Sequence, residues 1–392
     1  MAFRDGSETA STVSAQSAGV LEPTPPEVKQ YQRQKLIASL VSLALSLILL
    51  VVTAFWAGPA IGRWVRDLVG ENRWLQLVVL AFIYGVSLEL LTLPFSFWSS
   101  FVLEHRYQLS NQTFGRWVWR QIKGYLLAGP LGLALVLGLY ALLWYGGGYW
   151  WLWAAAAWLA VTLILGQIVP VVILPLFYKV TRLDNAELMD RLQRLARGTG
   201  LSLQGVYRLH LSAETRKANA ALAGLGRTRR VLLGDTLLDQ FTPEEIEVVF
   251  AHEVGHHVHG HLRKLVIWNV ILAGAGFWVA DLVLRYGAER LGYGVFDNPA
   301  ALPLVMLVLA GFGLVLSPLE NAVSRLFERQ CDRYALERTR LPDAYRAAFT
   351  KLARINKADP DRHPALVWLF DDHPPIRQRL ALADQLPVPT PH

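Results

Sequence analysis

The sequence predicts a mainly α-helical protein that crosses a membrane about six or seven times and carries a small β-sheet or hairpin outside it. Two observations favour this fold class. Of the 392 residues, 53% are hydrophobic and 18% are charged, so the chain is more apolar than soluble domains of this length. The apolar residues also form runs longer than the ~18 residues that cross a ~30 Å hydrocarbon layer as a helix. We find six such runs, at residues 36–58, 74–97, 124–146, 149–176, 263–285 and 301–323.

Residues 1–30 precede the first run and are rich in Ser, Thr, Ala, Pro and Glu. This stretch has no apolar core, so it predicts a disordered tail and not a cleavable signal. Residues 31–178 then contain four spans in close succession. Basic residues gather between Arg106 and Lys123, and loops of this kind stay on the cytoplasmic side. We therefore expect a multi-pass protein of a bacterial-type inner membrane, with residues 179–262 in the cytoplasm.

Net charge and cysteine count narrow the function classes. The net charge of +7 is explained by anionic lipid headgroups beside the spans, so we expect no nucleic-acid partner. Cys331 is the only cysteine, which excludes an intramolecular disulfide and a multi-cysteine zinc site. A metal in this chain therefore needs His and carboxylate ligands. Inside the spans, Glu89 predicts either a water-filled cavity or a structural hydrogen bond.

Residues 179–262 are expected to form a part outside the membrane with both helices and strands. A charged helical pattern covers residues 184–198. Two short β-type runs follow, at residues 203–212 and 229–235, and the Ala- and Gly-rich stretch between them indicates a hairpin or a sheet edge. A Thr-Pro-Glu-Glu sequence then forms a capping box, which predicts a helix start near Pro243.

His252 and His256 lie four residues apart on this helix, so both imidazoles project from one face and can bind one metal ion. With Glu253 they form H-E-x-x-H, in which the histidines bind zinc and the Glu takes a proton from the bound water. An incidental His-rich surface is the alternative. Three further histidines do not fit the extended metzincin pattern, although the first of them can still contact a ligand. We expect polar residues near the membrane surface at His257, His259 and His261.

A catalytic zinc site needs a third protein ligand and an open position. Residues 263–323 hold two spans, an even number of crossings, so the chain then returns to the side of the histidines. Residues 324–382 begin there and include Glu328 and Asp332, four apart on a helix. Either can bind the metal while the other supports a histidine through its second nitrogen. An ordinary salt-bridged surface is the alternative. Residues 383–392 read as a proline-containing tail.

With these residues the chain resembles the type I CAAX prenyl proteases, membrane-embedded gluzincin-type zinc proteases that remove the C-terminal tripeptide of prenylated proteins. The resemblance extends from about Leu90 to Leu382. Its segments are FVLEHRYQLSNQT (101–113), KANA (217–220), RVLLGDTLL (230–238), HEVGH (252–256), NAVSRLFERQCD (321–332) and DHPPIRQR (372–379). HEVGH occurs in many zinc proteases, whereas the FVLE segment is more particular to this family.

The resemblance implies a metal centre with one Zn²⁺ and a separate base. Its ligands are then His252, His256 and Glu328, so the family pattern selects Glu328 over Asp332 as the third ligand. Glu253 becomes the general base that activates water. Asp332 becomes a partner that supports a ligand from behind.

The resemblance also implies residues that contact substrate. Asn219 and Ala220 belong to an edge strand that holds the substrate backbone by β-augmentation. His373 donates to the oxyanion of the tetrahedral intermediate. Arg325 and Arg379 are either structural or bind a carboxylate.

We therefore expect a zinc metalloendopeptidase with an intramembrane chamber, acting as a monomer on peptide or protein substrates that are prenylated or similarly apolar. The first alternative is a quality-control membrane protease of the heat-shock type, against which the FVLE segment and the number of spans argue. The second is a non-catalytic zinc-binding scaffold or a His-rich transporter, against which the intact Glu253 and the nearly bare spans argue. The family's eukaryotic members usually carry an aromatic residue where this chain has Ala221, so the substrate is less defined than the reaction.

Overall fold

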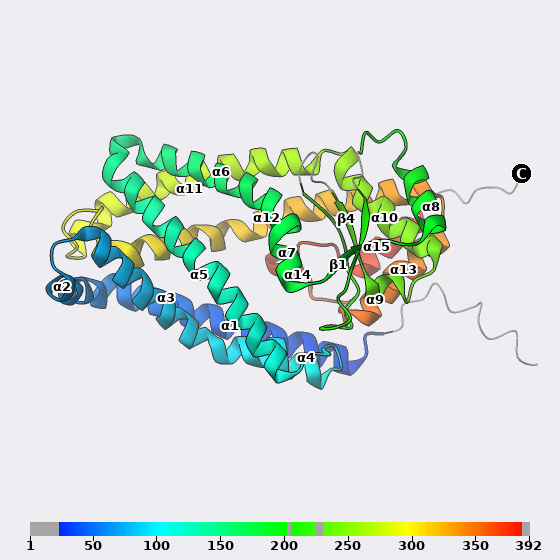
Figure 1. Ribbon diagram of the computed structural model, residues 1–392, viewed down its shortest axis with the longest axis horizontal. Coiled ribbons are helices and arrows are strands. Elements are labelled where there is room, and N and C mark those ends of the chain that lie inside the picture. The colour runs from blue at the N-terminus through cyan, green and yellow to red at the C-terminus, as the bar shows by residue number, and fades with distance from the viewer. Residues whose placement is uncertain (1–22, 202–204, 225–229, 386–392) are drawn as a thin grey trace, which may run out of the picture.

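The computed structural model describes residues 23–201, 205–224 and 230–385. The two expected tails fall mostly outside these ranges, and the first helix begins at Pro26. The described chain forms an elongated molecule, with long helices at one end and a small sheet with shorter helices at the other (Figure 1).

Among the described residues, six helical segments are long and apolar enough to cross a membrane, which confirms the six spans expected from the sequence. Three of these segments contain a π-helical turn, at Thr53–Ala57, Trp98–Val102 and Val169–Ile173. The first four segments consist of α1 (Pro26–Val52), α2 (Gly58–Val69), α3 (Arg73–Phe97), α4 (Leu103–Arg106), α5 (Phe114–Tyr145), α6 (Trp150–Ile168) and α7 (Leu174–Phe177). The last two consist of α11 (His261–Arg290) and α12 (Leu302–Thr339). The chain is an integral, multi-pass membrane protein.

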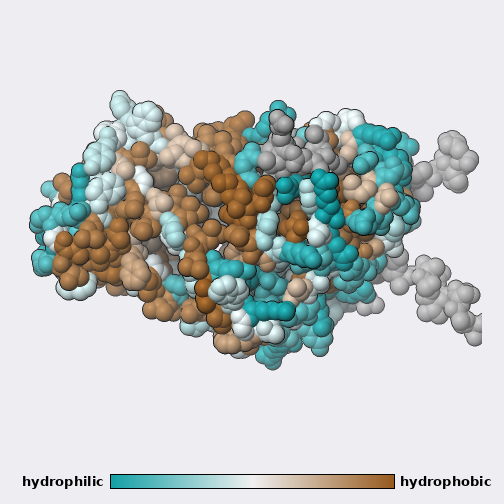
Figure 2. Space-filling model, viewed as in Figure 1, coloured by the Kyte–Doolittle hydropathy of each residue, from teal (hydrophilic) through white to brown (hydrophobic). Residues whose placement is uncertain are grey.

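The surface of the long helices is that of a protein solvated by lipid. Apolar side chains cover this end of the molecule and hydrophilic ones cover the sheet end (Figure 2). Large apolar residues such as Phe82 and Val315 are mostly exposed, at 70% and 77%. Each helix satisfies its own backbone hydrogen-bonding groups, which hydrocarbon cannot satisfy. Because so many of the apolar side chains on these helices are exposed, the arrangement is stable only in a bilayer. A buried cluster that includes Leu77, Tyr140 and Leu284 holds the helices together.

Two of the spanning helices lead directly into the part outside the bilayer. Helix α12 is continuous over 38 residues, so the boundary expected at residue 323 lies inside one helix. Helix α10 (Pro243–Val258) and α11 are separated only by a turn at Gly260, whose φ of 64° is left-handed. A residue without a side chain adopts this conformation at little cost. The helix start expected near Pro243 is confirmed, with the capping box formed by Thr242 and Glu245.

The sheet has four strands, in the order β1-β2-β4-β3. They are β1 (Val180–Arg182), β2 (Val206–Leu209), β3 (Ala220–Ala223) and β4 (Arg230–Gly234). The two β-type runs of the sequence, β2 and β4, pair in parallel, so these two runs do not form a hairpin with each other. Parallel strands need a connection that brings the chain back to the end of the sheet where the first strand began, and the connection between β2 and β4 is long enough for this. It contains β3, which pairs antiparallel with β4. The alternative of a sheet edge is correct, because β3 is an outer strand.

Shorter helices surround the sheet. They are α8 (Ala186–Ala196), α9 (Asp235–Leu238), α13 (Pro342–Ile355), α14 (Pro364–Phe370) and α15 (Ile376–Ala383). A second buried cluster includes Leu233 of β4, Leu237 of α9 and Phe250 of α10, so the sheet packs against α10. This packing fixes the position of the H-E-x-x-H helix relative to the edge strand β3.

Candidate metal centre

Helices α10 and α12 bring together the three residues expected to bind metal. His252 Nε2 lies 3.2 Å from Glu328 Oε2, and His256 Nε2 lies 3.2 Å from Glu328 Oε1. One nitrogen from each histidine and one carboxylate oxygen all lie within 4.8 Å of one another. These separations suit three donors that share one ion at about 2.0–2.2 Å each.

Gly255 allows the two helices to approach closely enough for this geometry. A Cβ at this position would lie 3.0 Å from Cα of Cys331, on the facing turn of α12. Any side chain there would push α10 away from α12. The glycine between the two histidines of the motif therefore has a packing role in forming the metal centre.

The donor set fits a zinc ion. Glu328 is 4% exposed. Its buried Oε2 atom lies near Nε2 of His252 and Nε2 of His373 but receives no well-directed hydrogen bond from the described residues. A buried carboxylate oxygen needs a donor or a cation. Two imidazoles and one carboxylate are a standard set for catalytic zinc, which leaves one coordination position for water or substrate.

The second ring nitrogen of His252 has a charged partner. Its Nδ1 atom donates a hydrogen bond to Asp332 Oδ1, at 2.9 Å. Asp332 in turn accepts from Nε and Nη2 of Arg379, at 2.9 and 2.6 Å, and that guanidinium lies 4.0 Å from the centre of the Phe349 ring. Burial lowers the pKa of His252, but the neighbouring carboxylates of Asp332 and Glu328 outweigh this effect and raise the pKa to about 9. The surroundings of the ring thus attract a cation, whether a proton or a metal ion.

The second ring nitrogen of His256 has a neutral partner. Its Nδ1 atom lies 3.2 Å from Nδ1 of His261, and Nε2 of His261 lies 2.9 Å from Oε1 of Gln330. His261 is 1% exposed and stacks on Phe327 with ring centres 4.2 Å apart. His261 begins a spanning helix, and there it is buried behind the motif. The turn at Gly260 reverses the chain and directs this side chain back toward the motif.

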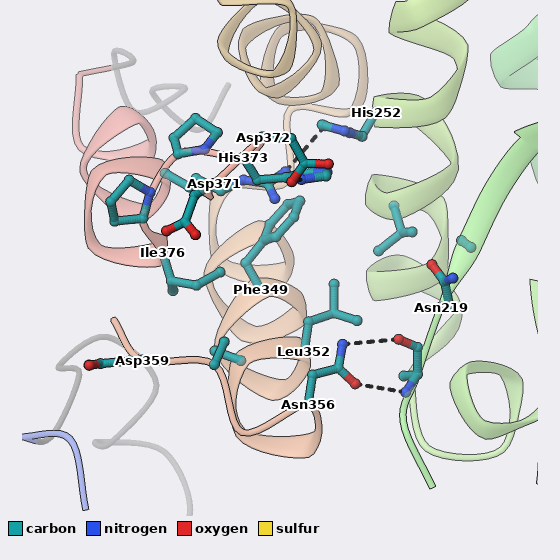
Figure 3. A pocket seen from close by; sticks show the side chains of 18 of the residues that line it. Asn219, His252, Phe349, Leu352, Asn356, Asp359, Asp371, Asp372, His373 and Ile376 are labelled. Carbon is teal, nitrogen blue, oxygen red and sulfur yellow. Dashed lines mark hydrogen bonds and ion pairs between the residues drawn. The ribbon is translucent and has the colours of Figure 1, made fainter. Parts of the chain in front are cut away.

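Glu253 faces the edge strand β3. Its Oε2 atom accepts a hydrogen bond from the backbone N–H of Leu222, at 3.1 Å. Glu253 and His252 line an open cavity of about 410 Å³ together with Asn219 and Ala220, the residues expected in the substrate-binding strand. Figure 3 shows Asn219 on the strand across the cavity from Phe349. The described structure thus places the expected base and the expected substrate strand in one cleft.

His373 lies on the opposite wall of this cleft (Figure 3). Its Nε2 atom is 3.4 Å from Glu328 Oε2, and its Nδ1 atom is 2.7 Å from Oδ1 of Asp372. The hydrogen bond with Asp372 raises the pKa of His373. Its side chain is 54% exposed to the cleft, so a charged imidazole there is accessible to a substrate.

Two other residues singled out in the sequence have structural contacts. The guanidinium of Arg325 donates to the backbone oxygens of Val367 and Asp371, so it holds the segment that carries His373. Glu89 accepts a hydrogen bond from Tyr125 Oη at 2.6 Å. Of the two alternatives given for Glu89, a water-filled cavity or a structural hydrogen bond, this contact is the second.

Two residues that hold the chain at the start of β3 were not found by sequence reasoning. Asn356, at the end of α13, bonds through its side-chain amide to the backbone of Ala218. Glu104 is buried and contacts Nζ of Lys217 at 2.7 Å and the hydroxyl of Tyr31 at 2.8 Å, so it fixes the chain that enters β3. The available signal for Glu104 was a carboxylate within the apolar FVLE segment. Asn356 gave no signal, because its partner is 138 residues away.

Comparison with known families decides the identity of the chain. A model of peptidase family M48 matches residues 182–386, and a model described as the CAAX prenyl protease N-terminal region with five membrane helices matches residues 19–179. The chain belongs to the type I CAAX prenyl protease family. Membership makes it an enzyme, a membrane-embedded zinc metalloprotease that acts on a peptide or protein substrate. The matched N-terminal region contains four candidate spans among its described residues.

Individual relatives of this protease agree with the family models. The metalloprotease YhfN of Bacillus subtilis (strain 168) is 29% identical over 388 residues, which cover 96% of this chain and 90% of the relative. The CAAX prenyl protease 1 homolog of Arabidopsis thaliana is 31% identical over 325 residues, which cover 80% of this chain and 74% of the relative. The crystal structure of S. mikatae Ste24p has the same fold, with a TM-score of 0.79 at 24% identity, and the match covers 91% of this chain and 88% of that chain.

Proposed function

We propose that this protease is a monomeric zinc metalloendopeptidase that cleaves near the C-terminus of prenylated CAAX proteins or similar apolar substrates. One zinc ion is held by His252, His256 and Glu328. The observation that carries the proposal is the convergence of these three donors within 4.8 Å, next to Glu253 and an edge strand in one cleft.

Glu253 is the general base of the proposed reaction. When held by these three donors, a zinc ion would supply a Lewis acid for the substrate carbonyl and would lower the pKa of a bound water toward ~7. The Glu253 carboxylate takes a proton from the attacking water and then delivers it to the amine that leaves. Its hydrogen bond with Leu222 N holds the carboxylate beside the strand to which the substrate backbone binds.

His373 stabilises the negative charge that develops on the carbonyl oxygen. Asp372 favours the protonated form of this imidazole, and a charged donor is stronger than a neutral one. The Nε2 atom already faces Glu328, at 3.4 Å, so the carbonyl oxygen of a bound substrate lies within its reach. Asp332 and Arg379 fix the orientation of His252.

Asn219 and Ala220 bind the substrate backbone. The N–H and C=O groups on the outer edge of β3 can pair with an extended peptide, which adds a strand to the sheet. The relatives named CAAX prenyl protease 1 support a substrate that ends in a prenylated cysteine motif. The apolar spanning helices next to the cleft provide the surroundings that a lipid chain on the substrate needs.

The basic segment from Arg106 to Lys123, at the end of α4 and the start of α5, supports an orientation with the metal centre on the cytoplasmic side. Arg120, near the start of α5, forms an ion pair with Glu214, which precedes β3, so this end of α5 lies on the same side as the sheet. Positively charged loops stay in the cytoplasm. We place the protein in a bacterial-type inner membrane on this basis.

The test compares a farnesylated CAAX peptide with its unprenylated counterpart, using detergent-purified protein with and without a chelator. Cleavage of the farnesylated peptide alone, lost with the chelator, is the expected result. Cleavage of both peptides at similar rates would favour the alternative, a quality-control protease with a broader substrate range. Cleavage that persists after zinc has been removed would contradict the proposed mechanism.

A further inference from the structure

The backbone that leads into β3 alternates in direction. The C=O of Asn219 accepts from the N–H of Gly234 at 2.9 Å, so Asn219 directs its backbone toward β4. Ala220 pairs with Leu233 in the register of β3 and β4. In an antiparallel ladder, the residue next to a hydrogen-bonded one directs its own groups away from the partner strand. Ala218, Ala220 and Leu222 therefore all direct their backbone groups toward the open edge.

Side chains already occupy both ends of this edge. At one end, Asn356 Oδ1 accepts from the N–H of Ala218 at 2.9 Å, and Asn356 Nδ2 donates to the C=O of Ala218 at 3.0 Å (Figure 3). These two bonds are those that the next residue of an added strand would make. At the other end, Glu253 accepts from the N–H of Leu222. Among the described residues, no hydrogen bond engages the outward groups of Ala220.

We propose that Asn356 is a specificity-determining residue that sets where a bound peptide must leave the edge of the sheet. Its amide takes the position of one strand residue beside Ala218, so an added strand pairs with Ala220 and cannot continue past it. The length of peptide recognised on that side of the scissile bond is thereby fixed. This inference rests on the proposed function, because it requires that the substrate backbone binds at Ala220.

The position of Asn356 is well fixed for this role. Its backbone N–H donates to the C=O of Leu352 at 3.0 Å at the end of α13, and Leu352 belongs to the buried clusters on either side of that helix. Asn356 itself lines the same cavity as Glu253 and Ala220. The amide thus stands at the end of the cleft on a rigid support, and a peptide cannot displace it without breaking both bonds to Ala218.

The test measures kcat/KM for two nested series of peptides, one lengthened residue by residue before the scissile bond and one lengthened after it. In the wild type, kcat/KM stops rising in one series once the peptide fills the position beside Ala220, because Asn356 occupies the next position, beside Ala218. In Asn356→Ala, the rise continues for one further residue, by roughly threefold to tenfold, because two backbone hydrogen bonds become available. Asn356→Ser is too short to reach both groups and gives the same longer profile if the alanine variant folds poorly.

Asn298 offers a matched control. Its side chain also donates to one backbone C=O, that of Tyr293, and accepts from one backbone N–H, that of Ala300, but it lies far from the cleft. Asn298→Ala should keep the wild-type length profile. Profiles of both Asn356 variants that run parallel to the wild type would show a purely structural role and overturn the inference. Absence of cleavage by the wild type in every peptide would instead overturn the proposed function, and this inference with it.

Discussion

His252 and His256 lie one helical turn apart on α10, and each approaches a different oxygen of Glu328 at 3.2 Å. The two histidines differ in the partner of the ring nitrogen that points away from the metal centre. His252 rests on a buried carboxylate, Asp332, which is itself paired with Arg379. His256 rests on His261, a neutral ring.

This difference bears on how firmly each ligand is held. A carboxylate partner increases the basicity of a ligating imidazole and fixes its tautomer. A neutral imidazole can fix the tautomer but adds no charge: His261 accepts the Nδ1 proton of His256 and donates from Nε2 to Gln330. We therefore expect changes behind His252 to weaken the metal centre more than changes behind His256.

The largest effect is expected from Asp332→Asn. The change removes the charge behind His252 and leaves the buried Arg379 without its partner, which costs about 3–5 kcal/mol of folding free energy and lowers zinc affinity by roughly 10–100-fold. Chemical denaturation and a competition assay with a chelator measure the two quantities. Zinc affinity equal to that of the wild type would contradict the claim that the charged partner of His252 strengthens zinc binding.

Gly255→Ala is expected to affect both sides equally. The added methyl group lies 3.0 Å from the backbone of Cys331, and overpacking of this kind costs about 1–3 kcal/mol. Because α10 moves away from α12 as a unit, both histidines move away from Glu328. Unfolding curves and zinc content should fall together, whereas a loss of stability with normal zinc binding would show that the helices separate elsewhere.

His261→Leu is expected to lower zinc affinity about tenfold, at the lower end of effects for ligand partners. Leu fills most of the space beside Phe327 but cannot accept the proton of His256. His261→Asn keeps an acceptor near the position of Nδ1 and should restore most of the affinity. The measurement is the rate of zinc transfer to a chelator. A wild type that binds two zinc ions per chain would instead assign His261 and Cys331 to a second metal site.

The smallest effect is expected from Gln330→Glu. A carboxylate in place of the amide would accept from His261 Nε2 and give His256 a charged support like that of His252. Zinc loss should slow by about twofold to fivefold, as expected for a hydrogen bond strengthened by a charge. Faster loss in the same chelator assay would contradict this account of the His256 side.

The sequence was sufficient for the features that depend on local patterns. The six spans follow from apolar runs, and the start of α10 follows from its capping box. The helical spacing also placed His252 and His256 on one face, and an even number of crossings allowed Glu328 to reach them. These inferences need only the period of the helix and the thickness of the bilayer.

Contacts between distant segments could not be predicted. The parallel pairing of β2 with β4 depends on the path of the chain between them, which periodicity does not determine. The two hydrogen bonds between the Asn356 side chain and the Ala218 backbone join residues 138 positions apart. The contact of His261 with His256 could not be predicted either. The direction of the His261 side chain is set by the left-handed turn at Gly260 and by packing on Phe327, not by its place in a His-rich stretch.

The most direct test of the central claim compares Glu253→Gln with Glu328→Gln in zinc content and in cleavage of a farnesylated CAAX peptide. The account predicts that Glu253→Gln retains one zinc ion per chain but loses cleavage by at least about 10²-fold, since it lacks only the base. It predicts that Glu328→Gln loses both zinc and cleavage. Substantial turnover by Glu253→Gln, or normal zinc content in Glu328→Gln, would contradict the assignment of base and ligand.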